Sequence, residues 1–232
     1  MAAPELLAPG VYRVNAIGLK NAINVLLLEN DDGWTLVDTG VGSSIGRIRD
    51  AVKALGSGPE DLRRVFVTHH HGDHVGGLPG VLEWAPHAEV WTPEKEAEIV
   101  SGRRPPDPSS SPLWRFVRRN QRLPTAPAAK ALREGDLVSG FRAVATPGHT
   151  LGHVSLLRDE DGLLFTADAF GCLPRRIRVG VVKPFCTDPP LAKRSAEKLL
   201  GEDFATVMLA HGPVLRSDAR AALRGALDRC DY

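Results

Sequence analysis

The chain has 232 residues, of which 43% are hydrophobic and 25% charged, proportions that are ordinary for a globular protein with a sizeable core. A net charge of +1 gives no overall field that would favour nucleic acid or an anionic membrane. No apolar run reaches about eighteen residues and no basic, apolar leader opens the sequence, so we expect neither a membrane-spanning helix nor export. Three widely spaced cysteines predict reduced thiols in a cytoplasmic protein.

The first third of the chain is typical of a sheet followed by a helix. Apolar residues predict four strands there, which are Val11–Ile17, Asn24–Asn30, Trp34–Gly40 and Arg63–Thr68. Asp31–Gly33 has the composition of a hairpin turn, and a helix is predicted over Ser44–Leu55 with Ser43 or Ser44 as its N-cap. The fourth strand lacks polar alternation, which predicts burial on both of its faces.

The remaining elements follow the same order after a proline-rich stretch. They are strands over Ala88–Pro93, Phe141–Pro147, His153–Asp159, Gly162–Asp168 and Ala205–His211, and helices over Pro93–Val100, Leu113–Arg122, Leu191–Leu200 and Ser217–Arg229. Six prolines and three consecutive serines between Ser101 and Pro127 indicate an insertion or lid at about 101–130. Two groups of strands, each ending in helix, predict one domain over 1–232, an α/β (α+β) fold with four αββα layers.

The stretch Val67–Gly77, VTHHHGDHVGG, holds four of the eight histidines and follows the predicted buried strand. Protonated imidazoles in one loop would repel each other, whereas a divalent cation prefers neutral imidazole as a ligand. The pattern H-x-H-x-D-H exceeds what one open catalytic zinc needs and suits half of a two-metal centre. Its candidate ligands are His69, His71, Asp73 and His74, while the intervening His70 is expected to point away. A surface cluster or a cloning tag is disfavoured because the loop follows a buried strand.

Four further positions at predicted strand ends carry side chains that can ligate or support a metal. They are Asp38, His149, Asp168 and His211. One such position would be chance, but four beside the histidine loop form a constellation, and layered α/β proteins usually place their sites at strand ends.

These motifs, LVDTG, THHHGDHVGG, PGHTLGH, FTADAF and AHG, resemble in order and spacing the metallo-β-lactamase-fold superfamily, from about Val11 to Ala222. The resemblance implies an αββα sandwich with its metals at one edge. It implies one metal on His69, His71 and His149, a second on Asp73, His74 and His211, and Asp168 as a bridge between them. It also implies that Asp38 steadies the histidine loop. His153 would contact substrate or support a ligand, unless it only lines the pocket wall.

A centre of this kind predicts hydrolysis. Two divalent cations lower the pKa of a bridging water toward neutrality, and the hydroxide attacks a carbonyl carbon. Asp73, which could also accept the hydroxide's proton, and the bridging Asp168 are therefore the predicted catalytic residues. We expect two zinc ions, with iron or manganese as alternatives. The centre predicts the reaction type far better than the substrate, for which a thioester or a lactone is the leading expectation.

Differences from branches of the superfamily narrow the substrate. β-Lactamases usually lack an aspartate at the position of Asp168, so β-lactam hydrolysis is not expected to be the main role. Glyoxalase II enzymes share all seven ligands but carry a C-terminal helical domain, which the short stretch after His211 is not expected to form. Acyl-homoserine lactonases share the PGHTxGH stretch but commonly carry a tyrosine shortly after the bridging aspartate, where this chain has Ala169–Cys172. The expectation is a glyoxalase II-like or lactonase-like hydrolase.

Two other chemistries stay open as alternatives. A persulfide dioxygenase on this scaffold binds one iron through two histidines and an aspartate, and the full second ligand set disfavours it. A phosphodiesterase or nuclease is less favoured, because the sequence pI is near neutral and the RNA-gripping insertion of ribonuclease-Z-like proteins is not found. A non-catalytic domain is disfavoured because no ligand position is lost.

Basic residues raise one hypothesis about the substrate. Segment 101–130 carries seven basic residues against one acid, with Arg118 and Arg119 in its predicted helix, and a second cluster of Arg175, Arg176, Arg178 and Lys183 follows Asp168. If these clusters face the site, they would select an anionic small-molecule substrate. The competing interpretation is a solvated helix face with a dimer contact, which keeps a homo-oligomer open. Neither a membrane nor a nucleic acid partner is expected.

Overall fold

The computed structural model describes residues 3–118, 122–128, 130–173 and 176–232. Contacts between residues divide the chain into two compact units. Unit 1 comprises Met1–Pro105 and Leu123–Leu132, and unit 2 comprises Pro106–Arg122 and Arg133–Tyr232. Segment 101–130 is therefore shared, with its middle in unit 2 and its ends in unit 1. A single domain and a lid over this segment stay predictions.

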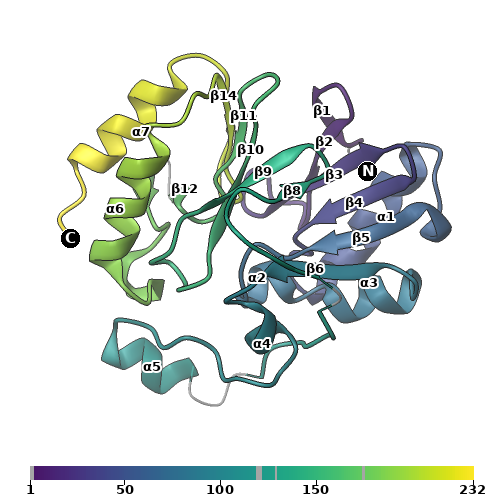
Figure 1. Cartoon of the computed structure of the whole chain (residues 1–232), viewed down its shortest axis with the longest axis horizontal. Helices are drawn as coiled ribbons and strands as arrows, with labels where there is room; N and C mark the ends of the chain where they lie inside the picture. Colours follow the sequence, from purple (N-terminus) through teal and green to yellow (C-terminus); the bar gives the residue numbers. More distant parts are fainter. Residues whose placement is uncertain (1–2, 119–121, 129, 174–175) are drawn as a thin grey trace. The chain divides into compact units, whose positions relative to one another are not determined.

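Unit 1 is built on a seven-stranded sheet in the order β1-β2-β3-β4-β5-β6-β7 (Figure 1). The strands are β1 Glu5–Ala8, β2 Val11–Asn15, β3 Asn24–Asn30, β4 Gly33–Val37, β5 Leu62–Phe66, β6 Glu89–Pro93 and β7 Lys130–Leu132. β1 to β4 are antiparallel and β4 to β7 are parallel. The helices are α1 Ile45–Ala54, α2 Gly72–Val75, α3 Leu78–Trp84 and α4 Ala97–Val100, with 3-10 turns η1 Gly42–Ser44 and η2 Pro59–Asp61.

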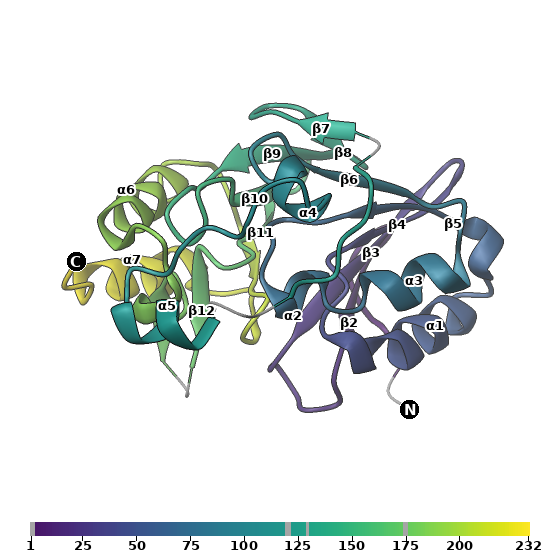
Figure 2. The ribbon, with the colours of Figure 1, turned by 90° about the horizontal axis from the view of Figure 1, so that it is seen from below.

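The core of unit 1 lies between this sheet and helices α1 and α3, which run side by side along one face (Figure 2). α1 buries Ile48 and Val52, and α3 buries Val81, in one apolar cluster with strand residues such as Val65. Burial of such side chains is the main favourable contribution to folding. This packing fixes the carboxyl ends of β4 and β5, where the chain leaves the sheet.

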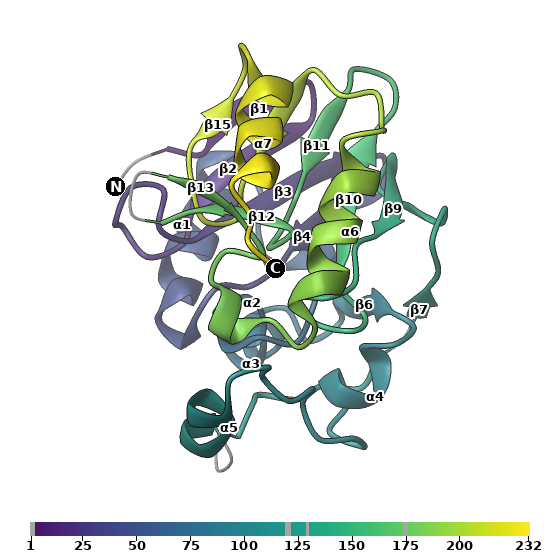
Figure 3. The same cartoon turned by 90° about the vertical axis from the view of Figure 1, so that its left-hand side faces the viewer.

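Unit 2 contains a six-stranded sheet in the order β15-β14-β11-β10-β9-β8 and a separate hairpin of β12 and β13 (Figure 3). The strands are β8 Leu137–Val138, β9 Phe141–Ala145, β10 Val154–Arg158, β11 Leu163–Phe165, β12 Phe170–Cys172, β13 Ile177–Val179, β14 Thr206–Met208 and β15 Val214–Leu215. The helices are α5 Pro112–Arg118, α6 Pro189–Leu199 and α7 Ala219–Asp228, with the 3-10 turn η3 Lys183–Phe185.

Helices α6 and α7 bury one apolar face each in the core of unit 2. The start of α6 is fixed locally, because Asp188 accepts a hydrogen bond from the amide of Leu191 at 3.0 Å and Pro189 occupies the first turn. α6 contributes Ala196 and α7 contributes Leu223 to the cluster that also contains Leu164 of β11.

Most predicted elements are present, and one expectation about where a helix begins is wrong. β5 is buried on both faces at Val65 and Phe66, as expected, while Arg63 near its start is exposed. No helix begins at Pro93, because Pro93 pairs with Leu132 as the last residue of β6 and α4 starts only at Ala97.

One finding concerns membranes. Within the described ranges, no helix combines the length and apolar character that crossing a bilayer requires. Cytoplasmic location stays a prediction.

Candidate metal centre

In unit 1, the histidine loop begins where β5 ends and runs into α2. His71 precedes the first residue of α2, and its carbonyl accepts hydrogen bonds from the amides of His74 and Val75. His69, His71 and His74 are all buried. Their rings gather, with centroids 4.0 Å apart for His69 and His74 and 4.9 Å apart for His69 and His71. One short segment therefore presents three imidazoles together, with Asp73 in the first turn of α2.

Asp38, at the end of β4, holds the loop from behind. Its carboxylate accepts a hydrogen bond from Nδ1 of His74 at 2.8 Å, and it accepts two more from the amide and hydroxyl of Thr68. Its backbone has a φ of 61°, a left-handed conformation that aspartate tolerates better than most residues. A buried carboxylate that accepts several hydrogen bonds needs no direct bond to a metal. Asp38 is therefore suited to orienting the ligands and not to binding the metal itself.

The hydrogen bonds around Asp38 also fix the orientation of two imidazoles. The hydroxyl of Thr68 donates to Asp38, so its oxygen accepts from Nδ1 of His69, which lies 3.0 Å away. His74 likewise uses Nδ1 as a donor to Asp38. Both rings then keep Nε2 as the unprotonated nitrogen, which is the form that binds a metal.

Two glycines allow the loop to pack against the connection from β4 to α1. A Cβ placed on Gly77 would lie 2.3 Å from the carbonyl oxygen of Thr39, and one on Gly76 would lie 2.8 Å from Cα of Val41. Thr39 in turn donates from its amide and its hydroxyl to the carbonyl of His74. The GG pair that closes the motif is thus required for this close approach.

His70 turns to another partner. Its Nδ1 lies 2.6 Å from Oε2 of Glu96, and both side chains are buried. This contact ties the loop to the residue that precedes α4.

In unit 2, three of the predicted ligands come together at buried ends of strands and turns. Oδ2 of Asp168 lies 3.0 Å from Nε2 of His149, and Oδ1 of Asp168 lies 3.4 Å from Nε2 of His211. The backbone of Ala167, with a φ of 44°, turns Asp168 out of the line of β11. Each carboxylate oxygen therefore faces a different imidazole.

The surroundings of His149 fix its tautomer and its charge. Its Nδ1 donates to the carbonyl of Gly180 at 3.2 Å, which leaves Nε2 for a ligand. Burial alone would lower the pKa of His149, but the charge and hydrogen bond of Asp168 outweigh it and raise this pKa to about 9. The site thus stabilises a positive charge at the position of Nε2, as a cation site should.

His153 supports Asp168 through its backbone. Ser155 donates to the carbonyl of Thr166 at 3.0 Å, so its oxygen accepts from the hydroxyl of Thr146 at 3.1 Å. Thr146 must then accept from Nδ1 of His153 at 2.8 Å, and Nε2 of His153 accepts from the amide of Asp168 at 3.0 Å. Both ring nitrogens are engaged, which makes His153 a positioning residue for Asp168.

The remaining predicted residues are placed as follows. Arg118 is the last residue of α5 and Arg119 lies outside the described residues, so their contact with substrate stays a prediction. Trp114 packs against Phe185 within unit 2, with ring centroids 4.8 Å apart, while Phe116 is exposed.

The residues that hydrogen-bond to the ligands and to the histidine loop are not predicted by the sequence patterns. Thr68, Thr146, Ser155 and Glu96 are common residue types in ordinary strands and turns. Thr68 directly precedes His69, and this adjacency is the one local signal in the sequence.

The donor sets fit divalent cations. Neutral imidazole and carboxylate are ligands that zinc and similar metals accept, and the other nitrogen of a ligating histidine usually donates to an oxygen. His69, His74 and His149 all show that arrangement. The described residues with ligand atoms suited to a metal include every member of the seven-residue set expected from the sequence.

Comparison with known proteins agrees with this fold and chemistry. The sequence model of the metallo-β-lactamase superfamily matches residues 19–211, and the chain belongs to this superfamily. It is 28% identical to the probable metallo-hydrolase YflN of Bacillus subtilis, over 96% of this chain and 91% of the relative. It is also 28% identical to a hydroxyacylglutathione hydrolase of Chelativorans sp., over 76% of this chain and 57% of the relative.

A solved structure confirms the fold class. The metallo-β-lactamase family protein TTHA1429 from Thermus thermophilus aligns with a TM-score of 0.70 at 24% identity, covering 96% of this chain and 80% of that protein. The mixed α/β fold and the family resemblance inferred from the sequence are both confirmed. The chain is a metallo-hydrolase of this superfamily with His/Asp clusters for divalent metal ions.

Proposed function

We propose that the chain is a dinuclear, zinc-dependent hydrolase that cleaves a small thioester or lactone. The observation that carries this proposal is the placement of Asp168, whose two oxygens face the Nε2 atoms of His149 and His211 separately. A carboxylate arranged in this way suits a bridge between two cations better than a ligand to one.

In the proposed assignment, the seven ligands expected from the sequence are divided between two cations. One would be held by His69, His71 and His149, the other by Asp73, His74 and His211, with Asp168 shared. Two bound cations of this kind supply an activated water and stabilise negative charge on a carbonyl oxygen. The part of the chain is to engage Nδ1 of these imidazoles, through Asp38, Thr68 and Gly180, so that Nε2 is the nitrogen available to a cation.

Asp73 has a further role in the proposal. It is half-buried in the first turn of α2, whereas the three imidazoles beside it are buried. A more exposed carboxylate among the ligands is suited to accept a proton and pass it to solvent.

The substrate class has weaker support. One relative is named a hydroxyacylglutathione hydrolase, which is a thioesterase, but this chain spans little more than half of its length. An acyl thioester or a lactone therefore remains the proposed substrate, and an anionic substrate the accompanying hypothesis.

Metal content and turnover test the proposal together. We expect near two zinc atoms per chain by mass spectrometry of the purified protein, and hydrolysis of members of a thioester and lactone panel. Asp168→Ala should lower turnover by at least about a hundredfold and reduce the metal content. Asp203→Ala, an exposed aspartate of the same unit, is the matched control and should change neither.

Two outcomes would overturn the proposal. Near one iron per chain, with oxygen uptake on a persulfide, would assign the dioxygenase alternative. Unchanged turnover in Asp168→Ala would remove the two-metal assignment.

A further inference from the structure

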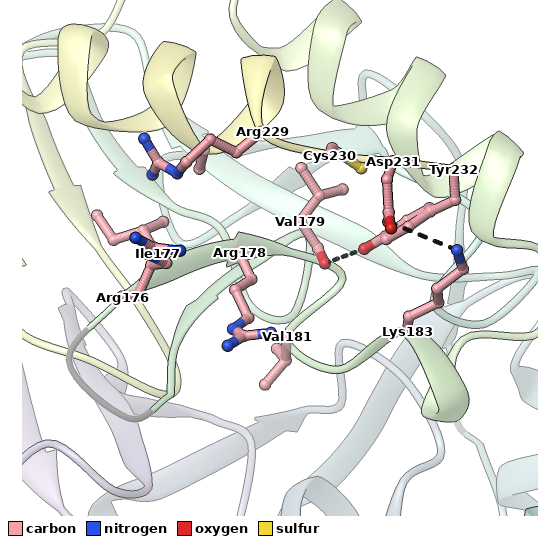
Figure 4. Close-up of a pocket in the computed structure, with 11 residues that line it drawn as sticks. Arg176, Ile177, Arg178, Val179, Val181, Lys183, Arg229, Cys230, Asp231 and Tyr232 are labelled. Atoms are coloured by element: carbon pink, nitrogen blue, oxygen red, sulfur yellow. Dashed lines mark hydrogen bonds and ion pairs between the residues drawn. The ribbon is translucent and has the colours of Figure 1, made fainter.

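A pocket of about 300 Å³ lies within unit 2, between the strand β13 and the end of the chain after α7 (Figure 4). Its apolar lining includes Ile177 and Val179 of β13, Val181, and Ala226 of α7. A cavity of this size is at the small end of the range that holds small molecules.

The charged side chains that line the pocket are mostly cationic. Four cationic side chains line it, Arg176, Arg178, Lys183 and Arg229, and Asp231 contributes the one acidic side chain of the lining. Arg176 and Arg229 lie toward one end, and Lys183 lies toward the other beside Asp231 and Tyr232 (Figure 4). Cations from two sides of one cavity produce a positive potential inside it.

The side chain of Asp231 does not neutralise the four cations. Among the residues that the structure describes, Asp231 pairs with Lys183 alone, at 3.5 Å. Arg178 uses Nε to donate to the carbonyl of Leu173, which leaves its terminal nitrogens for a ligand. Over residues 3–118, 122–128, 130–173 and 176–232, no carboxylate forms an ion pair with Arg176, Arg178 or Arg229.

The wall around Tyr232 is ordered by the chain itself. The hydroxyl of Tyr232 donates to the carbonyl of Val179, and Nζ of Lys183 lies 4.7 Å from the centre of the Tyr232 ring. Burial, with the neighbouring Cys186 and Cys230, raises the pKa of Tyr232, so this hydroxyl stays protonated. The side chain of Tyr232 thus closes one end of the pocket as a neutral aromatic surface.

The pocket is separate from the ligand atoms of the metal centre. Val179 and Val181 line it, and Gly180 between them accepts from Nδ1 of His149. The pocket is therefore on the Nδ1 side of this imidazole, whereas Nε2 faces Asp168.

We propose that this pocket is a second binding site, which takes a small organic anion with a carboxylate or phosphate group and an apolar part. The planar guanidinium groups match either anion through paired hydrogen bonds. The valine and isoleucine side chains and the Tyr232 ring would contact the apolar part.

Calorimetric titration of the purified protein tests the site with phenyl phosphate, benzoate and the uncharged phenol. We expect at least one of the two anions to bind at about millimolar concentration or below, and phenol to bind at least about tenfold more weakly. Arg178→Gln and Arg229→Gln should each weaken anion binding about tenfold, because each removes a charge-assisted hydrogen bond. Arg224→Gln, an exposed arginine of α7 outside the pocket, should bind as the unmodified protein does.

The same titration after removal of metal by a chelator separates this site from the metal centre. Retained binding that falls in Arg178→Gln supports the pocket even if no hydrolysis is ever found. Binding that vanishes on chelation but survives Arg178→Gln would place the anion on the metals and overturn the proposal. Absence of anion binding, or phenol binding as tightly as phenyl phosphate, would also overturn it.

Discussion

At the scale of single residues, Asp38 has the widest influence on the histidine loop. Its carboxylate orients His74 directly and His69 through Thr68. Asp38→Ala would leave these buried donors without an acceptor, at about 1–3 kcal/mol each in folding free energy. It should also weaken metal binding about 10- to 100-fold, as loss of a group that orients metal ligands does. Competition against a chelating dye measures the affinity.

Two further variants identify the cause of that loss. Asp38→Asn keeps the shape of the side chain, and asparagine tolerates the left-handed backbone, but its amide offers one acceptor oxygen in place of two. The metal affinity of this variant should therefore lie between those of Asp38→Ala and the unmodified protein. Asp32→Ala removes an exposed carboxylate of unit 1 that pairs with Arg64, and should leave metal affinity unchanged. Equal affinity in Asp38→Ala and the unmodified protein would show that Asp38 does not orient the ligands.

At the scale of elements, the approach of α2 to the β4–α1 connection depends on glycine. Gly77→Ala would place a methyl group 2.3 Å from a backbone oxygen of Thr39, so the backbone must shift. We expect a loss of about 1–3 kcal/mol in unfolding free energy by urea denaturation. Gly46→Ala in α1 meets nothing within 4 Å and should be neutral or stabilise by up to about 1 kcal/mol. A Gly77→Ala protein as stable as Gly46→Ala would contradict the close packing.

Some of the strands and helices can be predicted from the sequence, and others cannot. β3 has the predicted bounds because its apolar run and its two-residue turn are both local signals. The helix α3 was missed because Pro79 and Gly80 near its start have the composition of a turn, although proline is well placed in a first helical turn. The hairpin of β12 and β13 was missed because its strands have only three residues each.

Part of the candidate site can likewise be predicted from the sequence, and part of it cannot. The ligands are rare residue types at fixed spacing, so His69 and His71 are visible in the sequence alone. The partner of His70 is not, because Glu96 lies 26 positions away and reaches it only through the folded sheet. The bond from His153 to the amide of Asp168 is likewise a tertiary contact.

At the scale of the whole molecule, bound metal should stabilise a chain whose two units each have their own sheet and apolar core. The metal ions bind the folded chain and not the unfolded one. Metal at about 1,000 times its dissociation constant should therefore add about 4 kcal/mol to the free energy of unfolding. For a chain of this length that corresponds to a rise of about 10 °C in Tm. Differential scanning calorimetry of the zinc-loaded and chelated protein measures it. Asp168→Ala should show a much smaller rise, and an equal Tm with and without metal would show that metal does not bind the folded chain preferentially.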